Sequence, residues 1–141
     1  MVDKSYADIA KEASFVLSIL PPRDAFTFAE SFATAAAKRD RSSNPLVFAD
    51  CNAVNPETVK QISKLFEDRP EHIQFVDAGI IGGPPKDDYN PTFYASANNE
   101  QALAAFEKLS NVGLKISLLR GEGTFLAAAL NNTASLCLLI I

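Results

Sequence analysis

Short apolar runs of strand length alternate along this chain with segments that carry apolar residues at helical spacing. This alternation predicts an α/β fold, because strands that alternate with helices of roughly ten to fifteen residues normally form a mostly parallel sheet with helices on both faces. We predict strands over residues 15–20, 46–49, 72–76, 92–97 and 114–119. With 141 residues, 48% of them apolar, the chain can close one hydrophobic core.

Capping signals locate the helices between these strands. A side-chain oxygen placed just before an apolar helical pattern accepts hydrogen bonds from first-turn backbone N–H groups, so such residues predict where a helix starts. The predicted helix starts are Ser5 with Asp8, Asp24, Asn55 before Pro56, and Asn98 with Gln101. Gly113 is expected to end the fourth helix through a left-handed cap.

Charge and cysteine content argue against several classes of partner. The chain has 13 Lys and Arg against 17 Asp and Glu, and its net charge of -4 gives no electrostatic attraction to nucleic acid or anionic lipid. Cys51 and Cys137 have neither metal-ligand nor redox-pair spacing, so we expect no metal site. No apolar signal segment opens the chain, and we therefore expect a reduced, cytoplasmic protein.

The end of the chain is unusually apolar. Residues 124–141 contain no charged side chain. A membrane-spanning helix needs about 20 apolar residues, and Asn131, Asn132, Thr133 and Ser135 interrupt this stretch. We therefore expect a helical tail over residues 121–141, following a first domain over residues 1–120, rather than a membrane span.

The candidate site residues are those that follow each predicted strand, because ligands in open α/β sheets collect at the carboxyl ends of the strands. Three such segments stand out. They are Leu20-Pro21-Pro22, residues 50–53 (Asp-Cys-Asn-Ala), and residues 77–85, which contain Gly79, Gly82 and Gly83.

Each segment also has a purely structural interpretation. The proline pair can simply end a strand, Asp50 and Asn52 can form a solvated or capping pair, and glycines beside prolines can form a tight turn. Spacing alone leaves both interpretations open for the glycine-rich segment.

Taken together and in this order, the three segments resemble the β-hydroxyacid dehydrogenases, the family of 6-phosphogluconate and 3-hydroxyisobutyrate dehydrogenases. The likeness covers residues 5–119. It implies a Rossmann-like domain that binds NADP or NAD, of which this chain is the second half. The first βαβ unit of that domain would then be missing.

The resemblance implies contacts to the dinucleotide from the first two segments. In the family, a strand ending in Leu-Pro lies beside the dinucleotide, and a second strand ends in Asp-x-Ser-Thr-x-x-Pro near the nicotinamide. This chain matches the second motif at Asp50 and Pro56. Asn52 can still form hydrogen bonds there, whereas Ala53 cannot. The implied cofactor contacts are Leu20, Pro21, Pro22 and Asn52.

The third segment resembles the family's Asp-Ala-Pro-Val-Ser-Gly-Gly motif, which holds the substrate carboxylate. Gly79 stands in place of the proline and Ile81 in place of the serine. Because Ile81 offers no side-chain hydrogen bond, the resemblance implies that a substrate would depend on backbone groups of Gly82 and Gly83 beside Ile81.

Two functional parts of the family have no counterpart in this sequence. Nothing before Ser5 supplies the Gly-x-Gly-x-x-Gly turn that holds the pyrophosphate. Residues 121–127 resemble the segment that carries the catalytic lysine, but Ala127 stands at the lysine position. We therefore predict no catalytic residue, and whether the chain is an enzyme stays open. His72, the only histidine, is interpreted as a surface residue.

Three hypotheses follow. We favour a partial NAD(P)-binding domain of a 6-phosphogluconate dehydrogenase-like oxidoreductase that is not catalytic by itself. The alternatives are a non-catalytic, self-associating protein, because loss of the neighbouring unit would leave strand 15–20 with an unpaired edge, and a truncated gene product without its own function.

Overall fold

The computed structural model describes residues 5–40, 44–68 and 72–120, which form one five-stranded sheet in the order β1-β2-β3-β4-β5. The strands β1, β2 and β3 run parallel, β4 is antiparallel to β3, and β5 is parallel to β4. Their bounds are β1 (Phe15–Ser18), β2 (Leu46–Asp50), β3 (Ile73–Ile81), β4 (Thr92–Ser96) and β5 (Lys115–Leu118). The predicted mostly parallel α/β sheet is confirmed.

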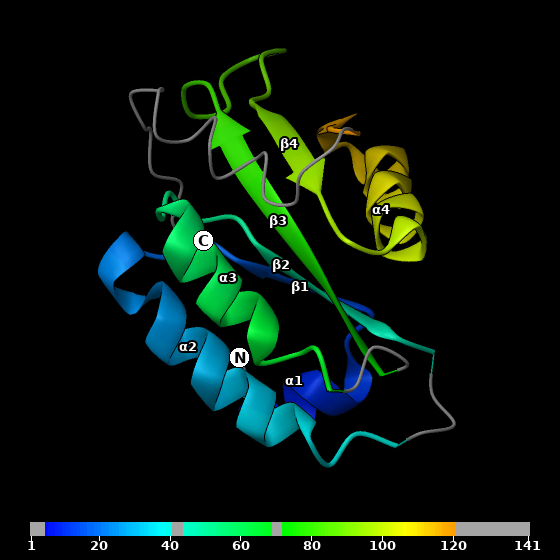
Figure 1. The fold of residues 1–141 in the computed structure, drawn as a ribbon. Coiled ribbons are helices and arrows are strands. Elements are labelled where there is room, and N and C mark those ends of the chain that lie inside the picture. The colour runs from blue at the N-terminus through cyan, green and yellow to red at the C-terminus, as the bar shows by residue number, and fades with distance from the viewer. Residues whose placement is uncertain (1–4, 41–43, 69–71, 121–141) are drawn as a thin grey trace.

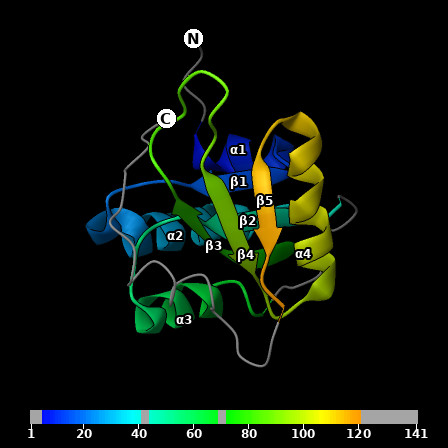
Figure 2. The same cartoon turned by 90° about the horizontal axis from the view of Figure 1, so that it is seen from above.

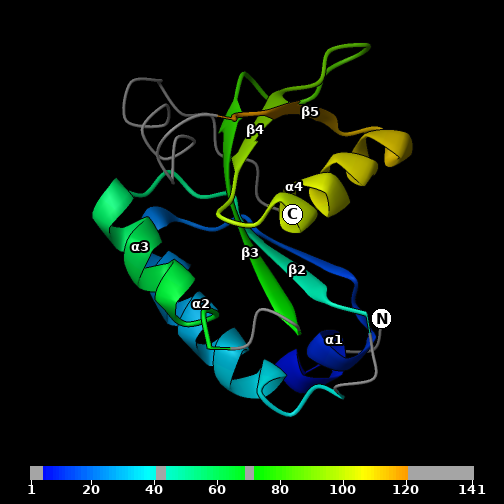
Figure 3. The same ribbon diagram turned by 45° about the vertical axis from the view of Figure 1, so that its right-hand side comes forward.

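Helices cover both faces of this sheet, as predicted (Figures 1 and 3). The helices α2 and α3 pack on one face, with α1 against α2, and α4 packs on the other. Figure 2 shows how far the sheet twists between β1–β2 and β4–β5. The helix bounds are α1 (Tyr6–Glu12), α2 (Pro22–Ala36), α3 (Pro56–Lys64) and α4 (Glu100–Glu107), which continues into a 3-10 turn, η1 (Lys108–Val112).

The alternation of side chains along each strand divides the core into two clusters. On β2, Leu46 and Phe48 face α2 and α3, whereas Val47 and Ala49 face α4. The first cluster is rich in aromatic rings, with the centroids of Phe48 and Phe66 only 4.7 Å apart. The face covered by α2 and α3 is therefore the more aromatic of the two.

Most of the predicted caps are present. The side chain of Ser5 forms a capping box with Asp8, and Asn55 accepts a hydrogen bond from the backbone N–H of Thr58 at 2.8 Å. Gly113 ends the turn after α4 in the left-handed conformation, with φ of 100°. At the start of α4 the cap is Asn99, which accepts from the Gln101 N–H, and not the neighbouring Asn98.

The prediction that Asp24 caps the second helix is wrong. Helix α2 already begins at Pro22, and Asp24 lies within its first turn. The fixed φ of proline suits the first helical position, where a missing N–H costs nothing, so the proline pair both ends the strand segment and starts the helix. In the first turn of α2, the Asp24 carboxylate lies near the positive end of the helix dipole.

Strand β3 is longer than predicted. Residues 72–76 were expected to be the strand and residues 77–85 a loop, yet β3 continues to Ile81. Its first half pairs with β2 and its second half with β4, and Asp77 is the residue that pairs with both. Pairing with the antiparallel strand β4 stabilises this segment as a strand, although its composition alone favours a loop.

The predictions made for the end of the chain concern residues outside the described ranges. The expected helical tail over residues 121–141, including Ala127 and Cys137, is among them. Within residues 5–40, 44–68 and 72–120, no helix has the length and apolar character needed to cross a bilayer.

Candidate functional site

The carboxyl ends of β1 and β2 meet at one edge of the sheet, where the side chain of Asn52 joins them. Its Oδ1 accepts a hydrogen bond from the backbone N–H of Leu20, and its Nδ2 donates to Ser18 Oγ at 2.9 Å and to Asp50 Oδ1. Leu20 and Asn52, which sequence reasoning placed at one site, are thus in direct contact. We call residues 18–22 and 50–52 the rim.

The two helices that follow these strands begin at the rim. Pro21 and Pro22 form the cap and first residue of α2, and Asn55 with Pro56 starts α3 a few residues beyond Asn52. The N-termini of both helices therefore lie at the same sheet edge, and their partial positive charge favours an anionic ligand there. Pro22 is exposed, whereas Leu20 and Pro21 are half-buried.

Four polar side chains, two of them in the rim, occupy one line across the sheet, which we call the buried polar row. Ser18 pairs with Asp50, Asp50 with Asp77, and Asp77 with Ser96 in successive strands. Both aspartates are only 1% exposed. Sequence analysis missed this row. The usable signal was an Asp directly after each of two consecutive apolar runs.

Burial changes the acidity of this region. Burial, which the hydrogen bonds from Asn52 partly offset and to which the nearby Asp77 adds a smaller contribution, raises the pKa of Asp50 to about 7. Burial and the two aspartates also raise the pKa of the Cys51 thiol, which argues against a reactive thiolate. The interpretation of Asp50 and Asn52 as a solvated pair is wrong, because both are buried.

The glycine-rich segment forms a tight turn held by Tyr89. Gly82 has φ of 135°, and a Cβ atom there would lie 2.1 Å from Tyr89 Oη. The backbone N–H of Gly83 donates to the same hydroxyl at 3.2 Å, whereas a Cβ on Gly83 would meet nothing within 4 Å. Gly82 is therefore required by the turn itself, which favours the structural interpretation of that residue.

The glycine turn and the rim are not adjacent along β3. Asp77 lies level with Asp50, and Ile81 follows four residues later in the strand. At about 3.3 Å per residue, Ile81 is about 13 Å farther along the strand. The structure thus brings Leu20 and Asn52 together and places Ile81, Gly82 and Gly83 beyond them, at the end of β3.

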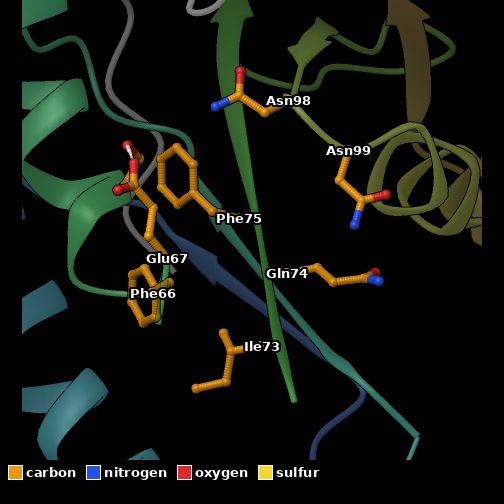
Figure 4. Close-up of a pocket in the computed structure, with 8 residues that line it drawn as sticks. Phe66, Glu67, Ile73, Gln74, Phe75, Asn98 and Asn99 are labelled. Atoms are coloured by element: carbon orange, nitrogen blue, oxygen red, sulfur yellow. Dashed lines mark hydrogen bonds between the residues drawn. The ribbon is translucent and has the colours of Figure 1, made fainter. Parts of the chain in front are cut away.

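The opposite end of β3 carries different features. His72 is buried at the entrance to β3, so its interpretation as a surface residue is wrong. A cavity nearby is lined by Phe66, Ile73 and Phe75 on one side of the strand and by Gln74 and Asn99 on the other (Figure 4). Because it lies at the start of β3, this cavity is not part of the rim.

Across the described part of the chain, no group of three or more His, Cys, Asp or Glu side chains is arranged to hold a metal ion.

Solved structures with the same fold are similar to this chain over most of its length. A conserved protein of unknown function with structural similarity to 3-hydroxyacid dehydrogenases is 27% identical, with a TM-score of 0.69 over 92% of this chain and 44% of that one. A conserved hypothetical protein from Sinorhizobium meliloti 1021 is 23% identical, with a TM-score of 0.69 over 89% of this chain and 38% of that one.

A third solved structure is an enzyme. The 3-hydroxyisobutyrate dehydrogenase of Mycobacterium tuberculosis, solved with L-serine, is 20% identical, with a TM-score of 0.63 over 92% of this chain and 43% of that one. No family model matches the sequence, and no curated protein matches it. The chain has the Rossmann-like α/β fold of 3-hydroxyacid dehydrogenase-like proteins and spans less than half the length of each of these three structures.

Proposed function

We propose that this chain is part of the NAD(P)-binding domain of a 3-hydroxyacid dehydrogenase-like oxidoreductase and that it does not transfer hydride by itself. The observation that carries the proposal is the rim, where Asn52 ties the end of β2 to Leu20. Two of the three motif segments thus meet at the sheet edge where α/β folds bind nucleotides. The fold shared with 3-hydroxyacid dehydrogenase-like structures supports the same assignment.

In this proposal the first two segments contact the dinucleotide. Leu20 and Pro21 offer a half-buried apolar surface against which a ring can pack, and Pro22 marks the N-terminus of α2, where an anionic group is favoured. The Asn52 side chain already makes three hydrogen bonds within the protein. Its main role in this proposal is therefore to position the Leu20 backbone rather than to contact the dinucleotide. The cofactor is NADP or NAD.

The third segment would contact the substrate from the end of β3. Ile81 offers an apolar side chain, and Gly82 and Gly83 offer backbone groups. The N–H of Gly83 now donates to Tyr89 Oη. A substrate carboxylate would take the place of that hydroxyl, because a charged acceptor forms the stronger hydrogen bond.

A titration of the purified protein with NADPH, NADP, NADH and NAD tests the proposal, with calorimetry or cofactor fluorescence as the readout. We expect dissociation constants of about 1 mM or tighter for at least one of them. Binding weaker than that for all four would leave only a shared fold and overturn the proposal.

A charge variant locates the site within the same titration. Pro22→Glu adds a negative charge at an exposed first helical position, where an acidic residue suits the helix dipole. We expect it to weaken dinucleotide binding about two- to fivefold, the size of an exposed charge interaction. Val112→Glu adds the same charge at a side chain that is 75% exposed on the turn after α4, and it should leave binding unchanged.

A second candidate function is self-association through β1. In the described sheet β1 is an edge strand that pairs only with β2, and Leu17, Ile19, Leu20 and Phe28 line an apolar groove beside it. An exposed strand edge next to apolar surface favours pairing with another chain. Light scattering at high protein concentration should then give a mass above that of the monomer, and a monomer throughout would exclude this candidate.

A further inference from the structure

The turn that follows β3 holds one oxygen atom in a recess that a glycine keeps open. Tyr89 Oη lies 2.1 Å from the position that a Cβ atom on Gly82 would take, and it accepts a hydrogen bond from the Gly83 N–H at 3.2 Å. The same Cβ position is 3.3 Å from Pro91, which also borders the recess. We call this recess, formed by Gly82, Gly83 and Pro91, the cradle.

The remainder of Tyr89 is not held by packing. The residue is 49% exposed, and it belongs to an arm, residues 83–90, in which every residue is exposed. Two backbone hydrogen bonds between Lys86 and Tyr89, at 3.1 and 2.9 Å, close the tip of the arm. Lifting Tyr89 out of the cradle therefore breaks the contact with Gly83 and leaves the tip intact, which makes it a local opening of low cost.

The charges around the cradle favour an anion once the arm has lifted. The tip has the sequence Lys-Asp-Asp at residues 86–88, so it is net negative and opposes an anion while it is in place. Ile81 pairs with Thr92, and Thr92 pairs with Lys115, so this exposed lysine stands in the same row as the last residue of β3. Lifting the arm takes two carboxylates away and leaves a cation two strands from the end of β3.

The space beside the cradle indicates what kind of ligand would fit. Gly83 is exposed, and a Cβ atom there would meet nothing within 4 Å, so the side of its N–H is open. The recess at Gly82 is filled by the single oxygen of Tyr89. One oxygen of a small ligand can therefore enter the cradle while the rest of the ligand lies over Gly83.

A carboxylate oxygen is a stronger acceptor for a backbone N–H than a neutral phenol oxygen is. We propose that Tyr89 is a removable stopper: its hydroxyl fills the cradle when no ligand is bound, and a small carboxylate binds there by displacing it. The inference rests on the proposed function, in which Gly82 and Gly83 contact the substrate. It adds the residue that regulates access to them.

Amide NMR of isotope-labelled protein at neutral pH tests the inference without any cofactor, with sodium acetate as the probe. We expect the Gly83 amide of the wild-type protein to shift as acetate is added. Tyr89→Phe keeps the exposed ring and removes the hydroxyl, so acetate should bind about two- to tenfold more tightly, the range for one exchanged hydrogen bond. Tyr6→Phe makes the same change on α1 at a residue that is 45% exposed, and it should match the wild-type protein.

The outcomes separate this inference from the proposed function. Equal acetate affinity in the wild-type protein and Tyr89→Phe, or a Gly83 amide that responds in neither, would overturn the inference. So would an equal response to acetamide, or to sodium chloride at the same ionic strength, because the cradle would then not select a carboxylate. None of these results involves a dinucleotide, so the cofactor titration decides the proposed function by itself.

Discussion

The face of the sheet under α2 and α3 contains two adjacent layers of opposite character. The first layer is aromatic, with Phe48 and Phe75 on neighbouring strands within a cluster of rings. The second layer lies two residues farther along the same strands and consists of Asp50 and Asp77 in the buried polar row. One pleat repeat therefore separates a layer of aromatic side chains, whose burial stabilises the fold, from buried carboxyl groups, whose desolvation opposes folding.

The difference indicates which layer serves the fold and which serves the site. Burying an aromatic side chain contributes several kcal/mol to stability, whereas burying a carboxyl group next to another one costs free energy. Protein cores retain such costly groups mostly at functional positions. The costly layer here lies at the rim, where the nucleotide is proposed to bind.

Removing a ring from the aromatic layer should have the largest effect. Phe48 is fully buried, and its ring contacts those of Phe28, Phe32, Phe66 and Phe75. Phe48→Ala should lower the free energy of unfolding by about 3–5 kcal/mol, through lost burial and a residual cavity. Urea denaturation gives the value, with Val112→Ala at an exposed position as the control; a loss below about 1 kcal/mol would contradict this account of the layer.

The polar layer should make stability depend on pH. Asp50 has a pKa of about 7 in the folded chain against an ordinary value of 3.8. The unfolded state therefore releases this proton more readily, and the free energy of unfolding should fall as pH rises from about 4 to about 7 and level off above that. The contribution is on the order of 4 kcal/mol at most.

A matched variant isolates this contribution from those of other titrating groups. Asp50→Asn keeps the shape and the acceptor for Asn52 but cannot ionise. It should resemble the wild-type protein at pH 4 and be the more stable of the two at pH 8, as judged by urea denaturation at each pH. Parallel pH profiles for the two proteins would show that Asp50 ionises normally in the folded chain.

The smallest effect is expected at the glycine turn, outside both layers. Gly82→Ala requires a side chain at φ of 135° and brings Cβ within 2.1 Å of Tyr89 Oη, so we expect a loss of about 1–3 kcal/mol. Gly83→Ala meets nothing within 4 Å and should change stability by less than about 0.5 kcal/mol. Equal losses at the two positions in thermal denaturation would mean that Tyr89 does not fix the turn.

The sequence predicted the parts of the rim that depend on local chemistry. The run that ends at Pro21 and Pro22 and the cap at Asn55 are signals within a few residues, and strand ends and helix starts follow them closely. The contact between Leu20 and Asn52 followed from the rule that parallel strands bring their carboxyl ends to one edge. The buried polar row was missed because burial of Asp50 depends on helices that come from elsewhere in the chain.

By itself, the sequence determined the alternation of strands and helices, and with it the α/β class, because hydrophobic periodicity and capping act over short distances. Tertiary structure alone decided that β3 continues to Ile81, that β4 runs antiparallel, and that Asp50 and Asp77 lie side by side. Those outcomes depend on pairing between strands far apart in the chain, where the partner and not the local composition sets conformation and burial.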